Sequence, residues 1–343
     1  MAKMKKNLII LIFLILPILL TSCSSVPSQP DPKEKRQFFA LDTLATITVY
    51  EAEPGVDTKK ALDSSEELCE YYEGLFSRTI RESDVYRINH SKGRETEADE
   101  STIFLIEESL KYSELSDGLF DITIAPVIEL WDSSADALPD STALSEALSH
   151  VSADNIVINK TAGTVRMKDP NAMIDLGAVA KGYIADRIKE QLMADKVTAA
   201  VIDLGGNILT VGSRPDGSPF NIGIKAPFSD TTSYYTEGTV FPDGIADSVK
   251  VSDRSVVTSG IYERYRLIGD RLYHHVLDPT TGYPVENTLA SVTVISDTSL
   301  EGDCLSTACL LLGKEKAEEL INALPDVEAI LIEKDGTLTE LLK

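Results

Sequence analysis

Two kinds of hydrophobic periodicity divide this 343-residue chain and limit the folds open to it. Residues 57–76 and 102–115 carry apolar side chains at intervals of three and four, which is helical spacing. From about residue 198 onward, short segments rich in Val, Ile and Thr predict strands. Helices in the first half and antiparallel-looking strands in the second half indicate an α+β fold, with mixed, largely antiparallel sheets and flanking helices.

The individual elements follow from the same patterns and from the turn residues between them. We expect a strand over 38–50, helices over 57–76, 102–115 and 141–149, and a hairpin of 155–159 with 164–167. A strand end at 173–175 leads into a helix that continues to about residue 192. The strands expected after this helix are 198–204, 208–212, 220–224, 247–258, 262–268, 273–277 and 289–296. Helical structure over about 303–323 and a final strand pair complete the expected elements. No change in composition marks a domain boundary, so residues 38–343 are expected to form one unit.

The N-terminus has the pattern of a bacterial lipoprotein signal. A positive start, an apolar stretch and a lipobox-like end follow one another: Lys3, Lys5 and Lys6, then residues 8–20, then Leu20-Thr21-Ser22-Cys23. The alternative is a membrane-spanning anchor, but thirteen apolar residues interrupted by Pro17 are short for a span of ~20 residues. We therefore expect residues 1–22 to be a signal peptide that is removed and Cys23 to be lipidated, with palmitate among its acyl chains.

The segment 23–37 is rich in Ser, Pro and charged residues and predicts a tether between the lipid and the folded unit. Together with the lipobox, it predicts an exported protein anchored to the outer face of the cell membrane. The formal charge of −23 argues against binding to nucleic acid, because neutralising phosphates requires clustered Lys and Arg.

The other three cysteines, Cys69, Cys304 and Cys309, form no CxxC pair, and four histidines leave little room for a zinc site. We interpret these cysteines as small buried hydrophobic residues. The sequence leaves a disulfide to Cys69 open.

The residues with the clearest chemistry lie in two segments near the C-terminus. Residues 274–284, HHVLDPTTGYP, predict a short strand that delivers two imidazoles and a carboxylate before a Pro/Gly turn. Asp303 and Thr307 are four residues apart at the start of a predicted helix, so they share one face. A carboxylate beside a hydroxyl suits a hard cation such as Mg²⁺. A nearby imidazole could take a proton in phosphoryl transfer.

A third segment, residues 175–182 (DLGAVAKG), places an acid at a strand end and a lysine at the start of a helix. Lys181 and the backbone amides could hold part of a phosphorylated ligand, because a helix N-terminus favours anions. The alternative is that Asp175 is an ordinary helix cap and that Lys181 is solvated. The segment 203–207 either makes room for a flat ligand or is only a turn; the segment 257–264 is interpreted as a turn, and Phe120 and Trp131 as core residues. No Walker, GxSxG or GxGxxG motif is present.

Taken in chain order, seven segments resemble the ApbE family, the FAD:protein FMN transferases. They are residues 38–50, 117–131, 174–186, 200–212, 257–264, 274–284 and 291–313. The resemblance implies an ApbE-like (T-fold-like) single catalytic unit over 38–343. It also implies a reaction in which the enzyme cleaves the pyrophosphate of FAD, transfers FMN through a phosphoester bond to a Thr or Ser of an acceptor protein, and releases AMP.

The resemblance also implies roles for individual residues. Asp303 and Thr307 match side-chain ligands of Mg²⁺, Ala178 matches a ligand through its backbone carbonyl, and His275 matches the general base. The expected contacts with FAD are Leu44, Leu119, Phe120, Asp121, Asp175, Lys181 and Val276. Leu44 stands where many members have Met, and Ser306 stands where some have a third acid, which predicts a weaker hold on the metal or a ligand water.

Two other functions remain open. An FAD pyrophosphatase would use the same site with water as the acceptor, and a surface lipoprotein could bind flavin without catalysis. For a transferase, the expected partners are subunits of membrane or extracellular electron-transfer systems, such as Rnf, sodium-pumping NADH:quinone reductase or fumarate-reductase-like proteins.

Overall fold

The computed structural model describes residues 31–134, 137–228 and 244–343. The expected signal peptide over 1–22, the lipidation site Cys23 and most of the expected tether over 23–37 lie outside the described residues. Within these described ranges, no helix is long and apolar enough to cross a membrane.

The largest element is an eight-stranded sheet in the order β1-β2-β6-β7-β10-β13-β14-β15. Its strands are β1 (Glu34–Ala40), β2 (Thr43–Ala52), β6 (Val197–Leu204), β7 (Asn207–Val211), β10 (Ser255–Gly260), β13 (Leu289–Ser296), β14 (Glu328–Glu333) and β15 (Leu338–Leu341). All neighbouring strands run antiparallel. The expected α+β fold with a largely antiparallel sheet is confirmed.

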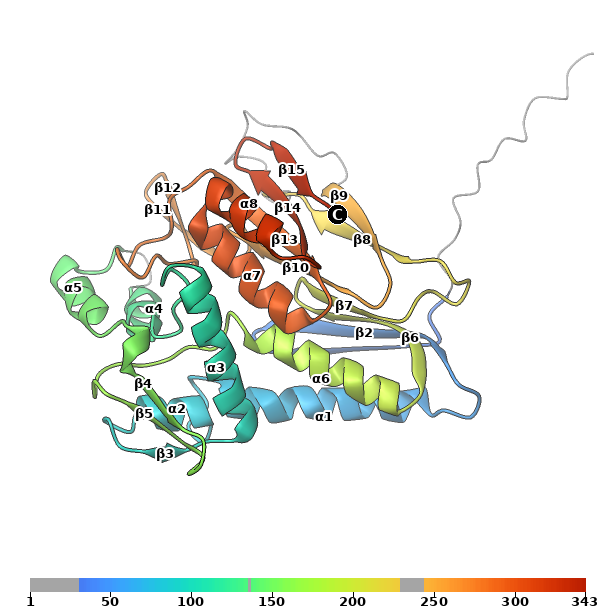
Figure 1. The fold of residues 1–343 in the computed structure, drawn as a ribbon, viewed down its shortest axis with the longest axis horizontal. Helices are drawn as coiled ribbons and strands as arrows, with labels where there is room; N and C mark the ends of the chain where they lie inside the picture. Colours follow the sequence, from blue (N-terminus) through green and yellow to red (C-terminus); the bar gives the residue numbers. More distant parts are fainter. Residues whose placement is uncertain (1–30, 135–136, 229–243) are drawn as a thin grey trace, which may run out of the picture. The chain divides into compact units, whose positions relative to one another are not determined.

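Helices cover one face of this sheet (Figure 1). They are α1 (Thr58–Phe76), α6 (Ala180–Ala194), α7 (Ser299–Leu312) and α8 (Lys314–Ala323). The hairpin of β8 (Phe220–Lys225) and β9 (Ile245–Val251) packs on the other face, where Phe220 and Ile222 belong to the same hydrophobic cluster as Ile295 of β13. Every residue of β13 is buried as a result. A strand covered on both faces reads as a continuous apolar run rather than an alternating one.

The remaining elements form smaller units beside the main sheet. They are α2 (Asp84–Asn89), β3 (Thr96–Glu97), α3 (Glu100–Leu115), α4 (Ala125–Ser133), α5 (Ser141–Ser149), β4 (Ile156–Asn159), β5 (Thr164–Met167), β11 (Tyr265–Ile268) and β12 (Arg271–His274). The predicted helix over 141–149 and the predicted hairpin of β4 with β5 are confirmed. The short helices α2 and α4 were not predicted: the six residues of α2 are too few for a clear helical period, and α4, unlike α5, begins without a side-chain cap.

The predicted single strand over 38–50 is wrong. The chain turns back at Leu41 and Asp42, whose φ angles of 55° and 57° give the mirror-image turn that joins two antiparallel strands. Because Leu-Asp is not the usual Asn-Gly signal for such a turn, the pattern alone did not reveal it. Strand β1 also begins at Glu34, so residues 34–37 lie in the strand rather than in the expected tether.

Three further expectations near the site need correction. The predicted strand over 247–258 is two strands, separated at Asp253, which has a φ angle of 60°. Residues 173–175 form only an isolated bridge, between Met173 and Ile124. Helix α7 begins at Ser299, so Asp303 lies in its second turn, and Gly313 separates α7 from α8.

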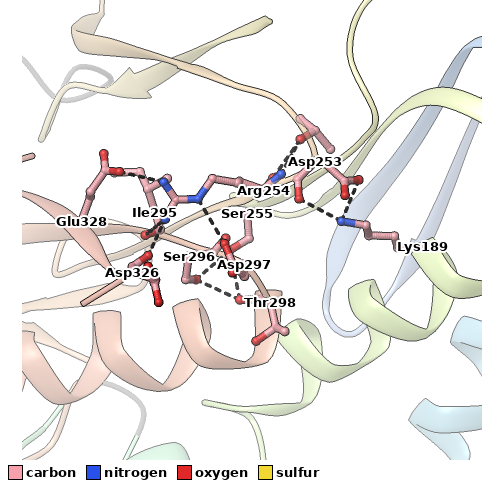
Figure 2. Close-up of polar contacts among 11 residues, drawn as sticks. Lys189, Asp253, Arg254, Ser255, Ile295, Ser296, Asp297, Thr298, Asp326 and Glu328 are labelled. Atoms are coloured by element: carbon pink, nitrogen blue, oxygen red, sulfur yellow. Dashed lines mark hydrogen bonds and ion pairs between the residues drawn. The ribbon is translucent and has the colours of Figure 1, made fainter. Parts of the chain in front are cut away.

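Arg254 joins β10, β13 and the segment leading into β14 (Figure 2). Its guanidinium donates to Glu328 Oε1 at 2.7 Å and to the carbonyls of Ile295 and Asp326 at 3.2 and 2.6 Å. Next to it, the hydroxyls of Ser255 and Ser296 donate to the Thr298 carbonyl at 3.1 and 2.9 Å. Because α7 begins one residue after Thr298, the sheet holds the start of this helix.

Cys69, Cys304 and Cys309 are buried free thiols. Burial raises the pKa of Cys69 and Cys309 to about 12. Their interpretation as small hydrophobic residues is confirmed, and no disulfide forms among these three.

Candidate active-site cavity

A cavity of about 970 Å³ gathers most of the residues singled out in the sequence. Its lining includes Leu119, Phe120, Asp121, Asp175, Ala178, Lys181, His275, Val276, Asp303 and Thr307. Leu44 is the exception: it does not line the cavity and is 56% exposed, although its neighbour Thr43 does line it. Segments from both halves of the chain therefore meet at one site.

Asp303 is the most deeply buried carboxylate of this group, with 3% of its surface exposed. Its Oδ2 accepts a hydrogen bond from the Gly182 amide at 2.9 Å, and its Oδ1 lies 3.5 Å from Lys181 Nζ. Burial raises the pKa of Asp303, and the Lys181 charge and the Gly182 hydrogen bond oppose this rise. Lys181 Nζ also donates to the Gly177 carbonyl at 3.3 Å. These two contacts hold its positive charge beside Asp303.

Hydroxyl groups continue the polar surface beyond Asp303. The Ser259 hydroxyl lies 3.0 Å from Thr307 Oγ1 and 2.9 Å from Ser306 Oγ. Sequence analysis did not assign a role to Ser259, and the available signal was the hydroxyl pair Thr258-Ser259 before Gly260. Ser306 faces this cluster from α7 and donates to the Asp303 carbonyl at 3.1 Å.

This donor set fits a hard divalent cation. A carboxylate, hydroxyls and a backbone carbonyl are oxygen ligands of the kind that Mg²⁺ takes. Among the described residues, no group of three or more His, Cys, Asp or Glu side chains could hold a metal. A cation beside Asp303 would therefore complete its shell with backbone oxygens, water and substrate phosphates, which is how Mg²⁺ commonly binds at phosphate sites.

His275 lies just beyond the end of β12 and is open to the cavity. Its Nδ1 lies 3.0 Å from the Arg264 carbonyl, which can only accept, so Nδ1 carries the proton and Nε2 is a free acceptor. Burial, together with the positive charges of Arg264 and Lys181, lowers the pKa of His275 to about 4. At pH 7 the imidazole is therefore neutral.

The neighbouring His274 has a different environment. It is buried, and its Nε2 donates to the Val285 carbonyl at 3.2 Å. Burial, followed by the nearby His275 and Lys334, lowers the pKa of His274 to about 4. Its hydrogen bond to Val285 and its burial indicate a structural role.

The buried His274 predicts a loss of stability in acid. The unfolded chain takes up a proton below pH 6.5, whereas the folded ring does so only near pH 4. The stabilisation is therefore complete above pH 6.5 and is lost as the pH falls toward 4, by about 3 kcal/mol for this shift. Urea unfolding at both pH values should show a smaller decrease for His274→Asn than for the wild type. Equal decreases would contradict this assignment.

An ion-pair network forms another part of the cavity wall and was not predicted. Arg78 pairs with Asp175 at 2.8 Å and with Asp132 at 2.5 Å, and Arg266 lies 3.6 Å from Asp132. Asp175 also accepts from the Gly177 amide at 2.7 Å, but it does not cap α6, which begins five residues later without a side-chain cap. Asp175 is therefore not the ordinary helix cap of the alternative interpretation, and it instead joins two loops of the cavity.

Solved structures of the same fold class include two from bacteria. The ApbE protein of Thermotoga maritima aligns with a TM-score of 0.79 and 28% identity, covering 90% of this chain and 96% of that one. The flavin transferase ApbE of Vibrio cholerae aligns with a TM-score of 0.77 and 25% identity, covering 90% and 96%.

The ApbE family model matches residues 41–331, and the chain belongs to the ApbE family. Two relatives are each named FAD:protein FMN transferase. That of Klebsiella pneumoniae is 35% identical over 272 residues, which cover 78% of this chain and 81% of the relative. That of Treponema pallidum is 32% identical over 318 residues, covering 88% and 84%.

Proposed function

We propose that this protein is a flavin transferase that moves FMN from FAD to a Thr or Ser hydroxyl of an acceptor protein, in a Mg²⁺-dependent reaction that forms a phosphoester bond and releases AMP. The observation that carries the proposal is the grouping of Asp303, Thr307 and Lys181 with a neutral His275 around one cavity. The names of the Klebsiella and Treponema relatives support the choice of FAD and FMN.

Asp303 is the central residue of the proposed site for the pyrophosphate of FAD. In the proposal, Asp303, Thr307 and the carbonyl of Ala178 hold Mg²⁺, whose chemistry there is to neutralise charge on the pyrophosphate oxygens. Lys181 turns its ammonium from Asp303 toward the same oxygens. Positive charge placed where negative charge develops is often the largest contribution to catalysis of this kind.

His275 supplies the base. Its free Nε2 accepts the proton of the acceptor hydroxyl while the hydroxyl oxygen attacks the phosphorus on the FMN side. The bond from that phosphorus to the oxygen of the AMP phosphate breaks, and AMP leaves with the electron pair. Leu119, Phe120, Asp121, Asp175, Lys181 and Val276, which line the cavity, are the proposed contacts with FAD, whereas Leu44 lies outside the lining.

The proposed setting is the outer face of the cell membrane, with Cys23 carrying the lipid and residues 23–37 linking it to the catalytic unit. The acceptors in this proposal are exposed subunits of electron-transfer systems such as Rnf, sodium-pumping NADH:quinone reductase or fumarate-reductase-like proteins.

The test of this function is mass spectrometry of a candidate acceptor after incubation with the protein, FAD and Mg²⁺. We expect a mass gain of one FMN moiety on a Thr or Ser and an equal amount of AMP. A parallel incubation without an acceptor tests the pyrophosphatase alternative: rapid AMP and FMN production there, with no labelled acceptor, would replace transfer by hydrolysis. Absence of both products would leave a flavin-binding protein.

A further inference from the structure

Helices α6 and α7 pack against each other, and their contacts repeat at intervals of four residues. On α6, Gly182 and Asp186 are four residues apart, and on α7, Ser299 and Asp303 are four residues apart. The Gly182 amide donates to Asp303, and Asp186 accepts from the Ser299 amide, so the two pairs form successive contacts along antiparallel faces. Ala178, which lies two residues before α6, and Thr307, one turn beyond Asp303 on α7, both line the cavity.

Asp186 is unusual because it caps a helix other than its own. Its Oδ1 accepts from the Ser299 amide at 2.8 Å and its Oδ2 from the Leu300 amide at 3.0 Å, the first two amides of α7. The first amides of a helix have no intrahelical partner, so a carboxylate that binds two of them is a strong anchor. The local cap, Thr298, accepts from Glu301 only at 3.3 Å.

The close approach of the two helices depends on Gly182. A Cβ at this position would lie 2.4 Å from the Ser299 carbonyl oxygen, so the lack of a side chain lets α7 lie directly on α6. Ser299 also donates through its hydroxyl to Asn207 Oδ1 at 2.5 Å. At such a short separation, a shift of α7 along its axis would break the bond between Gly182 and Asp303.

We propose that Asp186 is a positioning residue that sets the axial position of α7 and thereby places Asp303 and Thr307 at the cation site. On the sheet side, Ser255 and Ser296 hold the Thr298 carbonyl that precedes the helix (Figure 2), and Asn207 of β7 accepts from the Ser299 hydroxyl. Asp186 differs from these contacts because it holds the first two backbone amides of the helix. The proposal depends on the proposed function only for the identity of the cation.

Two variants separate the effect of the negative charge of Asp186 from the effect of its side-chain length. Asp186→Asn keeps the size but leaves a single acceptor oxygen for two amides, and Asp186→Glu keeps the charge but moves it outward by one methylene. The matched control is Asp140→Asn, because Asp140 also accepts from two helix amides, Thr142 and Ala143, but caps its own helix α5. All three are measured in the complete protein without FAD.

The first readout is hydrogen exchange at the Gly182 amide, which needs no metal. Because Gly182 lies in the first turn of α6 and its amide bonds to Asp303, we expect faster exchange there in both Asp186 variants and no change in the control. The second readout is Mn²⁺ affinity from electron paramagnetic resonance, which we expect to weaken by about 10–100-fold in both variants, the usual effect of losing support for a metal ligand.

Unchanged Gly182 exchange and unchanged Mn²⁺ affinity in folded Asp186→Asn and Asp186→Glu proteins would overturn the proposal. If Asp186→Asn does not fold, the Glu variant decides alone. A wild type that binds Mn²⁺ but labels no acceptor would contradict the proposed function and leave the positioning role intact. A wild type without Mn²⁺ binding would contradict the cation site, and Gly182 exchange would still decide the role of Asp186.

Discussion

The His275→Asn variant is expected to transfer FMN about 10²–10⁴-fold more slowly than the wild type while still binding FAD. Asparagine is the sharpest replacement because its amide nitrogen can occupy the place of Nδ1 and donate to the Arg264 carbonyl, as the imidazole does at 3.0 Å. The loop keeps its anchor and only the free Nε2 is lost. A large decrease in rate would therefore report the missing base.

The pH dependence gives a second test of His275. A base must be deprotonated to act, and the pKa of His275 lies below its usual value of 6.5, at about 4. The wild-type kcat/KM, which reflects the free enzyme, should therefore not fall through a midpoint near pH 6.5 but only at lower pH. This acid limb should be absent from the residual activity of His275→Asn.

Single-turnover measurements with saturating FAD and acceptor separate the chemical step from binding, and flavin fluorescence gives the FAD affinity. The matched control is His90→Asn, because His90 is exposed, stacks on Tyr86 and lies outside the cavity lining. The control should keep the wild-type rate. A wild-type rate in His275→Asn as well would remove His275 from the mechanism.

The elements that the sequence predicted well are those with a clear local period. Helices α1 and α5 begin next to Asp57 and Asp140, whose side chains cap them, so both pattern and boundary were readable. The turn at Leu41 and Asp42 was not readable, because it depends on two residues held at positive φ rather than on glycine. Glu73 on α1 accepts from the Leu41 amide at 3.0 Å, a contact that no local pattern contains.

In the candidate site, too, contacts within one element were predictable from the sequence, and contacts between distant segments were not. Asp303 and Thr307 share a helix face, so their proximity followed from a spacing of four. Their partners did not: Gly182 is 121 residues away in sequence from Asp303, and Ser259 is 48 residues away from Thr307. The resemblance to a family gave roles to ten of the residues that line the cavity, but it gave no role to Arg78 or Asp186, whose contacts only the folded chain brings together.

The second large effect is expected for Asp303→Asn. The amide keeps an oxygen that can accept from the Gly182 amide, as Oδ2 does at 2.9 Å, so the contact between α6 and α7 should persist. The buried negative charge is lost, and Lys181, whose side chain is 27% exposed, can turn to water without a carboxylate partner. Because burial disfavours the charged form of Asp303, a neutral amide there should not unfold the protein.

The expected catalytic consequence is a fall in turnover of about 10²–10³-fold, comparable to the loss of one strong electrostatic contact with the transition state. The response to Mg²⁺ should disappear at the same time, because without its carboxylate the donor set offers only neutral oxygens. Titration of the rate with Mg²⁺ at fixed FAD measures both effects. Asp297→Asn is the matched control, since Asp297 precedes the same helix but its side chain is 74% exposed.

The joint loss distinguishes a metal ligand from a carboxylate that only orients Lys181. A carboxylate acting through Lys181 would lower turnover and leave the Mg²⁺ titration midpoint unchanged, whereas a ligand would change both. Lys181→Met gives the complementary case: the Asp303 carboxylate remains available to the cation, so Mg²⁺ dependence should persist at a reduced rate. An unchanged Mg²⁺ midpoint in Asp303→Asn would therefore move the cation away from α7 and leave Asp303 as the counter-charge of Lys181.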